Sequence, residues 1–325
     1  MRRRAFLASV AALVPAFVAA QPTGIRRIGF LYFSTERSAK ELRRYQGFID
    51  GMREAGYTLG KHFMLEARYG DGDPAWLASM AAELVQARVE VIVTGGTAAN
   101  HAAHAATKTI PIVMVNSTDP VREGLVATLR RPGGNVTGMT TNTAQIDAKH
   151  VELLQESLPR FALLAVLVNP SNRAHEFRLK AIEGIATRHG AAIAPFSADT
   201  ADAINAAFVA LGHKRADALV VLGDNFYLQQ ARQIADLALK VKLPSISISP
   251  EYAQAGGLMT YGQNITENYR RAGRYVDRIL RGAKPADLPI EQPTTFELLI
   301  NQRTARAIGL SIPKSVLLRA DHVIE

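Results

Sequence analysis

The sequence of 325 residues contains no cysteine. The chain can therefore form no disulfide framework, no thiolate metal site and no lipid anchor on an N-terminal cysteine. Catalytic signatures are also missing, since there is no G-x-S-x-G elbow, no H-E-x-x-H motif, no P-loop and no G-x-G-x-x-G turn. These absences predict that the protein is not an enzyme and needs no cofactor.

Blocks of a single charge are absent as well. The net charge is +9, from 38 Lys and Arg against 29 Asp and Glu, and no basic block is interleaved with aromatic residues. We therefore expect no nucleic-acid partner. His101 and His104 lie three residues apart on a predicted helix and could face one metal ion, but no third ligand is apparent. We expect no metal site.

The N-terminus has the composition of a secretory signal peptide. Arg2, Arg3 and Arg4 precede an uncharged stretch over 5–20, which ends in V-A-A before Gln21. This stretch is shorter than the roughly 20 apolar residues of a membrane span, so an uncleaved anchor is the lesser alternative. The R-R-A-F-L run resembles a twin-arginine export signal, and both export routes stay open. We expect cleavage after residue 20 and a mature protein free in the periplasm.

Apolar strand-like runs alternate with helical runs along the rest of the chain. The first half contains predicted strands at 28–33, 63–69, 89–93 and 110–115, and helices at 38–55, 74–87 and 98–107. The second half repeats this order, with strands at 163–168, 191–196, 218–222 and 244–248, and helices at 173–189, 201–211 and 227–240. Such alternation indicates parallel sheets covered on both faces. The sequence therefore predicts an α/β fold of two doubly wound, Rossmann-like lobes.

The segments outside this repeat predict how the lobes are joined. Strands at 135–140 and 257–261 carry the chain from one lobe to the other, and we expect a later helix and strand, at 267–281 and 295–300, to return to the first lobe. Lobe one is then 25–137 plus 262–310 and lobe two is 138–261, with the tail 311–325 unassigned. Repeated crossings of this kind form a hinge, and hinged lobes close on ligands.

The candidate site lies beyond the carboxyl ends of the strands, where open α/β sheets bind their ligands. Short polar residues and glycines cluster there: Ser34, Gly95, Gly96, Thr97, Asn116, Thr118, Thr141, Asn169, Asp224 and Tyr261. Gly95 and Gly96 allow close backbone approach, and the next helix N-terminus favours an anion such as a carboxylate. Asp224 could pair with an ammonium group. Each polar residue alone could equally be a helix N-cap, so the prediction rests on their convergence.

A series of motifs from about residue 25 to the C-terminus resembles a known family. They are V-I-V-T-G-G-T at 91–97, T-D-P-V at 118–121, G-N-V-T-G at 134–138, G-G-L-M-T-Y-G at 256–262, F-E-L-L-I-N at 296–301, A-I-G-L-S-I-P at 307–313 and R-A-D at 319–321. In this order they resemble the ABC-transporter substrate-binding proteins of type I periplasmic binding fold, which include tryptophan- and tyrosine-type uptake proteins.

The resemblance implies a ligand site between the lobes, and better-studied members bind aromatic amino acids. By position it implies contacts from Ser34, Thr97, Asn116, Thr141, Asn169 and Asp224. Asn142 departs from the acidic residue that amino-acid binders of this group can carry, and Asn116 stands where a smaller residue is usual.

Together these features predict the periplasmic solute-binding component of an ABC importer. It would be a monomer that binds a small carboxylate-bearing ligand, such as an amino acid, aromatic ones included, and docks on the permease and ATPase complex. A ligand-sensing module for a membrane receptor and a two-lobed α/β transferase remain as alternatives.

Overall fold

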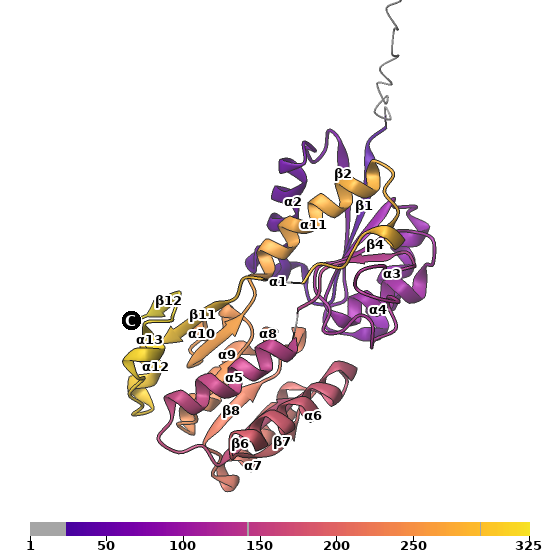
Figure 1. Cartoon of the computed structure of the whole chain (residues 1–325). Coiled ribbons are helices and arrows are strands. Elements are labelled where there is room, and N and C mark those ends of the chain that lie inside the picture. The colour runs from indigo at the N-terminus through magenta and orange to yellow at the C-terminus, as the bar shows by residue number, and fades with distance from the viewer. Residues whose placement is uncertain (1–23, 142, 293) are drawn as a thin grey trace, which may run out of the picture.

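The computed structural model describes residues 24–141, 143–292 and 294–325, which form two α/β lobes (Figure 1). The predicted signal peptide, its cleavage site before Gln21, and Asn142 lie outside these residues. Within the described part of the chain, no helix combines the length and the apolar character that a bilayer span requires.

The first lobe is built on a five-stranded sheet. Its strands are β1 (Arg26–Tyr32), β2 (Phe63–Tyr69), β3 (Val91–Gly95), β4 (Ile112–Met114) and β5 (Val136–Gly138). Its helices are α1 (Glu36–Glu41), α2 (Arg44–Glu54), α3 (Pro74–Gln86), α4 (Thr97–Ala106) and, from much later in the chain, α11 (Ile265–Leu280) with the short η1 (Pro285–Asp287).

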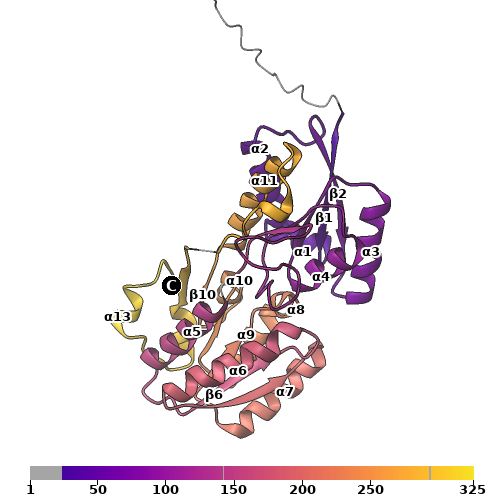
Figure 2. The same ribbon diagram turned by 45° about the vertical axis from the view of Figure 1, so that its right-hand side comes forward.

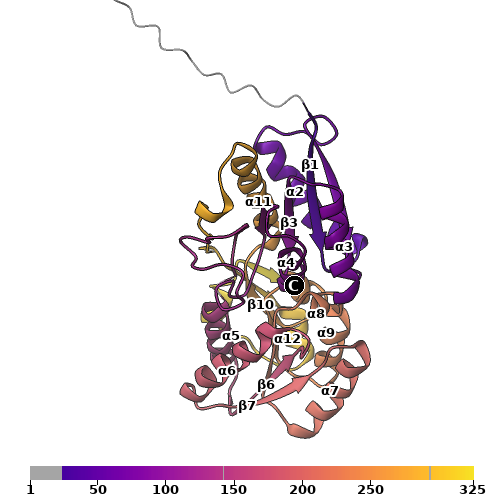
Figure 3. The ribbon, with the colours of Figure 1, turned by 90° about the vertical axis from the view of Figure 1, so that its right-hand side faces the viewer.

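The second lobe is built on a seven-stranded sheet. Its strands are β6 (Leu163–Val168), β7 (Ala192–Ser197), β8 (Ala218–Val221), β9 (Ser245–Ser247), β10 (Met259–Gly262), β11 (Glu297–Asn301) and β12 (His322–Ile324). Its helices are α5 (Thr143–Ser157), α6 (Arg173–Arg188), α7 (Ala201–Lys214), α8 (Asn225–Gln229), α9 (Ala231–Lys240), α10 (Pro250–Gln254), α12 (Gln302–Ala307) and α13 (Lys314–Leu317). Figure 3 shows the two lobes one above the other, with α3 on the upper and α7 on the lower.

The two sheets share one strand order. The first runs β2-β1-β3-β4-β5, and the second begins β7-β6-β8-β9-β10 before it adds β11 and β12. The pairs within the first sheet are parallel, and so are those of the second except β10 with β11. The prediction of two similar doubly wound α/β lobes is confirmed.

Alternate residues of the central strands pack on opposite faces, as the strand period of two requires. Ile28 and Phe30 of β1 pack in a core with α2 and α11, whereas Leu31 packs with α3 and α4. In the second lobe, Leu164 of β6 packs with α5 and α6, and Leu167 packs with α7 and α9. Each sheet is therefore covered on both faces, which explains its continuous apolar strands.

Two helices expected to be continuous are each interrupted. The helix expected at 38–55 divides into α1 and α2 at Arg43, which adopts a left-handed backbone with φ 55°. The helix expected at 227–240 divides into α8 and α9 at Gln230. Arg44, the first residue of α2 after the first break, is buried.

The end of the chain departs from the expected division. The helix expected at 267–281, α11, lies in the first lobe, but the strand expected at 295–300 does not return there with it. That strand, β11, pairs antiparallel with β10, Met259 opposite Ile300, and β12 pairs with β11. Its placement in lobe one was therefore wrong, because the edge that β10 offers lies in the second sheet. The chain passes between lobes after β5, after β10 and before β11.

Helices α2 and α11 lie side by side although they are far apart in the sequence (Figures 1 and 2). Glycines allow their backbones to meet: a Cβ on Gly51 would stand 1.9 Å from the carbonyl oxygen of Arg270, and one on Gly273 would stand 2.5 Å from the carbonyl carbon of Gly51. A Cβ on Gly47 would stand 2.7 Å from the Thr266 carbonyl oxygen. We call this contact the glycine seam.

Candidate ligand-binding site

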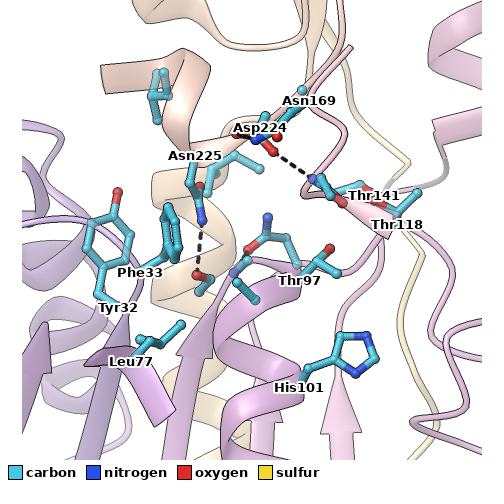
Figure 4. Close-up of a pocket in the computed structure, with 18 of the residues that line it drawn as sticks. Tyr32, Phe33, Leu77, Thr97, His101, Thr118, Thr141, Asn169, Asp224 and Asn225 are labelled. Carbon is cyan, nitrogen blue, oxygen red and sulfur yellow. Dashed lines mark hydrogen bonds between the residues drawn. The ribbon is translucent and has the colours of Figure 1, made fainter. Parts of the chain in front are cut away.

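A cavity of about 450 Å³ lies between the two lobes. Its size is within the usual range for small-molecule sites. Figure 4 shows Tyr32, Phe33 and Leu77 grouped at one side, while Asp224 and Asn225 of the second lobe lie opposite the first-lobe residues. The cavity therefore has an apolar side and a polar side, contributed by both lobes.

Eight of the ten predicted site residues line this cavity: Gly95, Gly96, Thr97, Asn116, Thr118, Thr141, Asn169 and Asp224. They lie together because the carboxyl ends of the strands in both sheets face the space between the lobes. Their contact with a ligand stays a prediction.

Ser34 and Tyr261 are not among the described residues that line the cavity. Ser34 is buried with 1% of its surface exposed, and its hydroxyl has no partner in the described chain. Tyr261 stacks on Phe296 with 5.6 Å between ring centroids, and its carbonyl accepts a hydrogen bond from His150 Nε2 at 2.7 Å. Ser34 follows its expected strand and Tyr261 ends its own, but both side chains pack against the protein and do not line the cavity.

Other lining residues escaped the sequence analysis, which looked for polar groups only. The apolar ones include Tyr32, Phe33, Leu77, Ile248 and Tyr269. The signal for two of them was present, because Tyr32 and Phe33 directly precede Ser34 at the end of the first strand. The charged ones are Arg44, Arg173 and Arg178. His101 also lines the cavity.

The N-terminus of α4 opens into the cavity. Gly96 holds the N-cap position with φ 95°, and no described side chain caps the helix. Asn116 Oδ1 accepts a hydrogen bond from the Gly96 amide at 2.9 Å, which fixes this turn. The next residues, Thr97 and Ala98, line the cavity at the start of a ten-residue helix. Unpaired first-turn N–H groups and the helix dipole favour an anion here.

Asp224 occupies the facing wall, with 7% of its side chain exposed. Its Oδ1 accepts hydrogen bonds from Asn169 Nδ2 at 3.2 Å and from the Phe226 amide at 2.8 Å, and its Oδ2 accepts one from Asn172 Nδ2 at 2.7 Å. An ionised carboxylate offers about four lone-pair sites, so Oδ2 can accept one further donor. Asp224 therefore caps α8, as the cap hypothesis allows, and keeps acceptor capacity.

The nearest titratable partner of Asp224 is uncharged at neutral pH. His175 Nε2 lies 3.9 Å from Asp224 Oδ2, but burial lowers the pKa of His175 to about 4, against the opposing effect of Asp224. Its Nδ1 accepts a hydrogen bond from the Asn169 amide at 2.8 Å, which fits the neutral ring. Arg178 is already paired with the buried Asp147, at 2.6 Å between Nη2 and Oδ1. Within the described chain, Asp224 thus has no cationic partner.

Several contacts join the lobes around the cavity. Asn225 Nδ2, next to Asp224 in the second lobe, donates to the carbonyl of Gly95, next to Gly96 in the first lobe, at 3.4 Å. Arg44 Nη2 of the first lobe pairs with Glu251 Oε1 of the second at 2.7 Å. The first of these contacts places the N-terminus of α4 next to the loop that carries Asp224.

The histidine pair on α4 gives no indication of a metal site. No group of three or more candidate ligands is found in residues 24–141, 143–292 and 294–325. His101 lines the cavity, with Nε2 3.7 Å from Glu123 Oε2, and its pKa is lowered chiefly by burial. His101 is therefore a neutral polar group of the wall.

Comparison with known proteins identifies the family. Residues 25–324 match the family described as ABC transporter substrate binding protein. A tyrosine-binding protein of Clostridioides difficile strain R20291 is 28% identical over 265 residues, which is 82% of this chain and 76% of that protein.

Two solved structures have a similar fold along their whole length. One is a conserved domain protein from Vibrio cholerae, with a TM-score of 0.86, 28% identity and coverage of 92% of this chain and 100% of that chain. The other is an ABC domain from Streptococcus pneumonia in complex with L-Trp, with a TM-score of 0.85, 27% identity and coverage of 93% and 100%. The chain belongs to the ABC transporter substrate-binding proteins, which are the ligand-binding components of transporters and not enzymes.

Proposed function

We propose that this protein binds an aromatic amino acid between its lobes and delivers it to the permease and ATPase of an ABC importer. The observation that carries this proposal is the pairing of opposite charge preferences across one cavity. Asp224 is a buried carboxylate with no cationic partner among the described residues, and it lies across the cavity from the N-terminus of α4, which no described side chain caps. A zwitterion satisfies both.

The α-carboxylate would lie against the first turn of α4, near Gly96 and Thr97, where N–H groups and the helix dipole stabilise an anion. The α-ammonium would donate to the free lone pair of Asp224 Oδ2. One carbon separates these two groups in an α-amino acid, so their two sites must be close. The hydrogen bond between Asn225 and the Gly95 carbonyl supports this closeness.

The apolar side of the cavity supports an aromatic side chain. Tyr32, Phe33 and Leu77 form a surface of rings and aliphatic carbon beside the polar anchors (Figure 4). Two similar proteins agree with this class, since one is named a tyrosine-binding protein and the other was solved with L-Trp. Gly95, Asn116, Thr118, Thr141 and Asn169 would complete the polar contacts.

The periplasm is the proposed compartment. The basic residues 2–4 and the uncharged stretch 5–20 support export, and a periplasmic receptor meets its ligand before the importer does. N-terminal sequencing of the periplasmic fraction should give Gln21 as the first residue. Full-length chain in the inner membrane would contradict this part of the proposal.

Calorimetric titration with deletion analogues tests the ligand class. L-Phenylalanine, L-tyrosine and L-tryptophan are compared with 3-phenylpropionate, which lacks the amine, and phenethylamine, which lacks the carboxylate. We expect at least one amino acid to bind, and both analogues to bind roughly 100-fold more weakly or worse, since each leaves one buried charge unpaired. Equal affinity for an amino acid and both of its analogues, or binding of sugars alone, would refute the proposal.

A further inference from the structure

A histidine lies directly behind the polar wall of the cavity. His175, near the start of α6, has 3% of its side chain exposed and is not among the described residues that line the cavity. Its ring bonds two loops that do line it, the one that follows β6 and the one that follows β8. These loops carry Asn169 and Asp224, whose side chains lie next to each other in the site (Figure 4).

Each ring nitrogen of His175 bonds one of the two loops. Nδ1 accepts a hydrogen bond from the backbone amide of Asn169 at 2.8 Å, and Nε2 lies 3.2 Å from the carbonyl oxygen of Gly223, the residue before Asp224. Because a backbone amide only donates and a carbonyl only accepts, the ring proton must be on Nε2. One neutral tautomer therefore bonds both loops at once.

The neutral state of this ring leaves the Asp224 charge to the ligand. Burial lowers the pKa of His175 to about 4, the Asp224 carboxylate opposes this effect, and the charge of Arg178 adds to it. A protonated ring would turn an Nδ1–H towards the Asn169 amide, which is also a donor, and it would be a cationic partner for Asp224 at 3.9 Å. The neutral ring holds the two loops and does not compete with a ligand ammonium.

The direction of the Asp224 carboxylate depends on how these loops lie against each other. Its oxygens accept hydrogen bonds from two side chains of the loop after β6, Asn169 at 3.2 Å and Asn172 at 2.7 Å. A shift of one loop against the other would change both contacts, and with them the lone pair of Oδ2 that remains for a ligand. Groups that bind a ligand need supporting contacts behind them, since a displacement of about 1 Å removes much of their effect.

We propose that His175 is a positioning residue, which ties the loop after β6 to the loop after β8 and so sets the geometry in which Asp224 receives the ligand ammonium. This inference rests on the proposed function. Loss of the His175 contacts should reduce the selection for the amine. The carboxylate site at the N-terminus of α4 belongs to the other lobe and should stay intact.

Calorimetric titration of the wild type and of His175→Phe with L-phenylalanine and 3-phenylpropionate tests this role. The substitution keeps an aromatic ring and removes both ring nitrogens. The wild type should prefer the amino acid by roughly 100-fold. The variant should lose about tenfold or more of that preference, while its affinity for 3-phenylpropionate changes less than about threefold. The ratio of two affinities measured on one preparation does not depend on how much of the protein is folded.

His150→Phe is the matched control. His150 is a fully buried histidine of the same lobe, its Nε2 bonds the Tyr261 carbonyl at 2.7 Å, and it is not among the lining residues. Its replacement should lower the stability of the protein and keep the wild-type preference for the amino acid.

Two further variants separate the contacts of the two ring nitrogens. His175→Gln can place a donor near the Gly223 carbonyl, and His175→Asn can place an acceptor near the Asn169 amide, so each variant keeps one contact. Because Gly223 directly precedes Asp224, His175→Gln should keep more of the preference for the amino acid than His175→Asn.

An unchanged preference in His175→Phe, or an equal fall in its affinities for the two ligands, would overturn the positioning role. If His175→Phe does not fold, equal preferences in His175→Gln and His175→Asn would overturn it. Failure of the wild type to bind any aromatic amino acid would instead refute the proposed function.

Discussion

Replacement of Asp224 by Asn removes one charge from the cavity and leaves the size of the side chain unchanged. The amide oxygen can still accept from Asn169 and from the Phe226 amide, and Asn is as good an N-cap as Asp, so α8 keeps its cap. The new amide nitrogen, however, takes the position of Oδ2 and meets Asn172 Nδ2, a second donor, at the present 2.7 Å.

The magnitude follows from these contacts. One lost hydrogen bond to a buried group costs about 1–3 kcal/mol of folding stability. Loss of the only charge partner of a buried ammonium costs about 3–5 kcal/mol of binding, which corresponds to a rise in Kd of roughly 100-fold or more at 1.4 kcal/mol per factor of ten. Asp224→Asn should therefore fold with reduced stability and bind amino acids very weakly.

The assay distinguishes the effect of the Asp224 charge on the ligand from its effect on the structure of the loop. Wild type and Asp224→Asn are titrated with L-phenylalanine and with 3-phenylpropionate, which differ only in the amine. The amino acid should lose affinity steeply, and the deaminated acid should lose little or gain, since a carboxylate near an anion repels it. Asp236→Asn, at an exposed position on α9, is the control and should match the wild type.

Equal weakening of the two ligands would refute the reasoning. That outcome would mean that Asp224 acts by holding the loop through Asn169 and Asn172, and that the ammonium pairs elsewhere. A thermal unfolding measurement on each variant shows whether lost binding reflects lost structure.

Three further outcomes are expected. Gly96→Ala should weaken every amino acid about tenfold or more, because a Cβ at φ 95° is strained and would stand 2.1 Å from Asn225 Nδ2, whereas Gly134→Ala, with open space around it, should leave calorimetric affinities unchanged. Burial lowers the pKa of His150 and His175 to about 4, so between pH 4 and 6.5 the unfolded chain binds more protons than the folded protein. The free energy of unfolding, measured by urea denaturation, should therefore rise with pH in this range by up to about 1.4 kcal/mol per pH unit for each histidine. A free energy of unfolding that does not change with pH would contradict the burial of two neutral histidines. Saturating ligand should reduce the radius of gyration in X-ray scattering as the lobes close, and superimposable curves would count against closure.

The lobes were predictable because their central strands are continuous apolar runs. Strand 63–69 and the start of α3 at Pro74 match the structure, in which Asp73 caps the helix, since both depend on local signals. No glycine or proline at Arg43 or Gln230 indicates that a helix is interrupted there. The pairing of β11 with β10 depends on which sheet edge is free, and no local pattern encodes that.

The polar half of the site was predictable for a similar reason. Gly96, Thr97 and Asp224 lie within three residues of the carboxyl ends of strands, so their place at the ligand-binding edge follows without knowledge of packing. Arg44 and Tyr269 reach the cavity from helices α2 and α11, whose positions depend on the fold of the whole chain. Ser34 follows its strand as expected, but its neighbours Tyr32 and Phe33 line the cavity instead.

The glycine seam bears on the order in which the chain can fold during synthesis. The first sheet is synthesised long before α11. Phe48 and Met52, both fully buried in the folded protein, therefore stay exposed to solvent until α11 is synthesised and packs against them. The first lobe cannot complete its core until Ile265–Leu280 has been translated. Because α11 follows β10 in the sequence, most of the second lobe is synthesised before the first lobe can complete its own core.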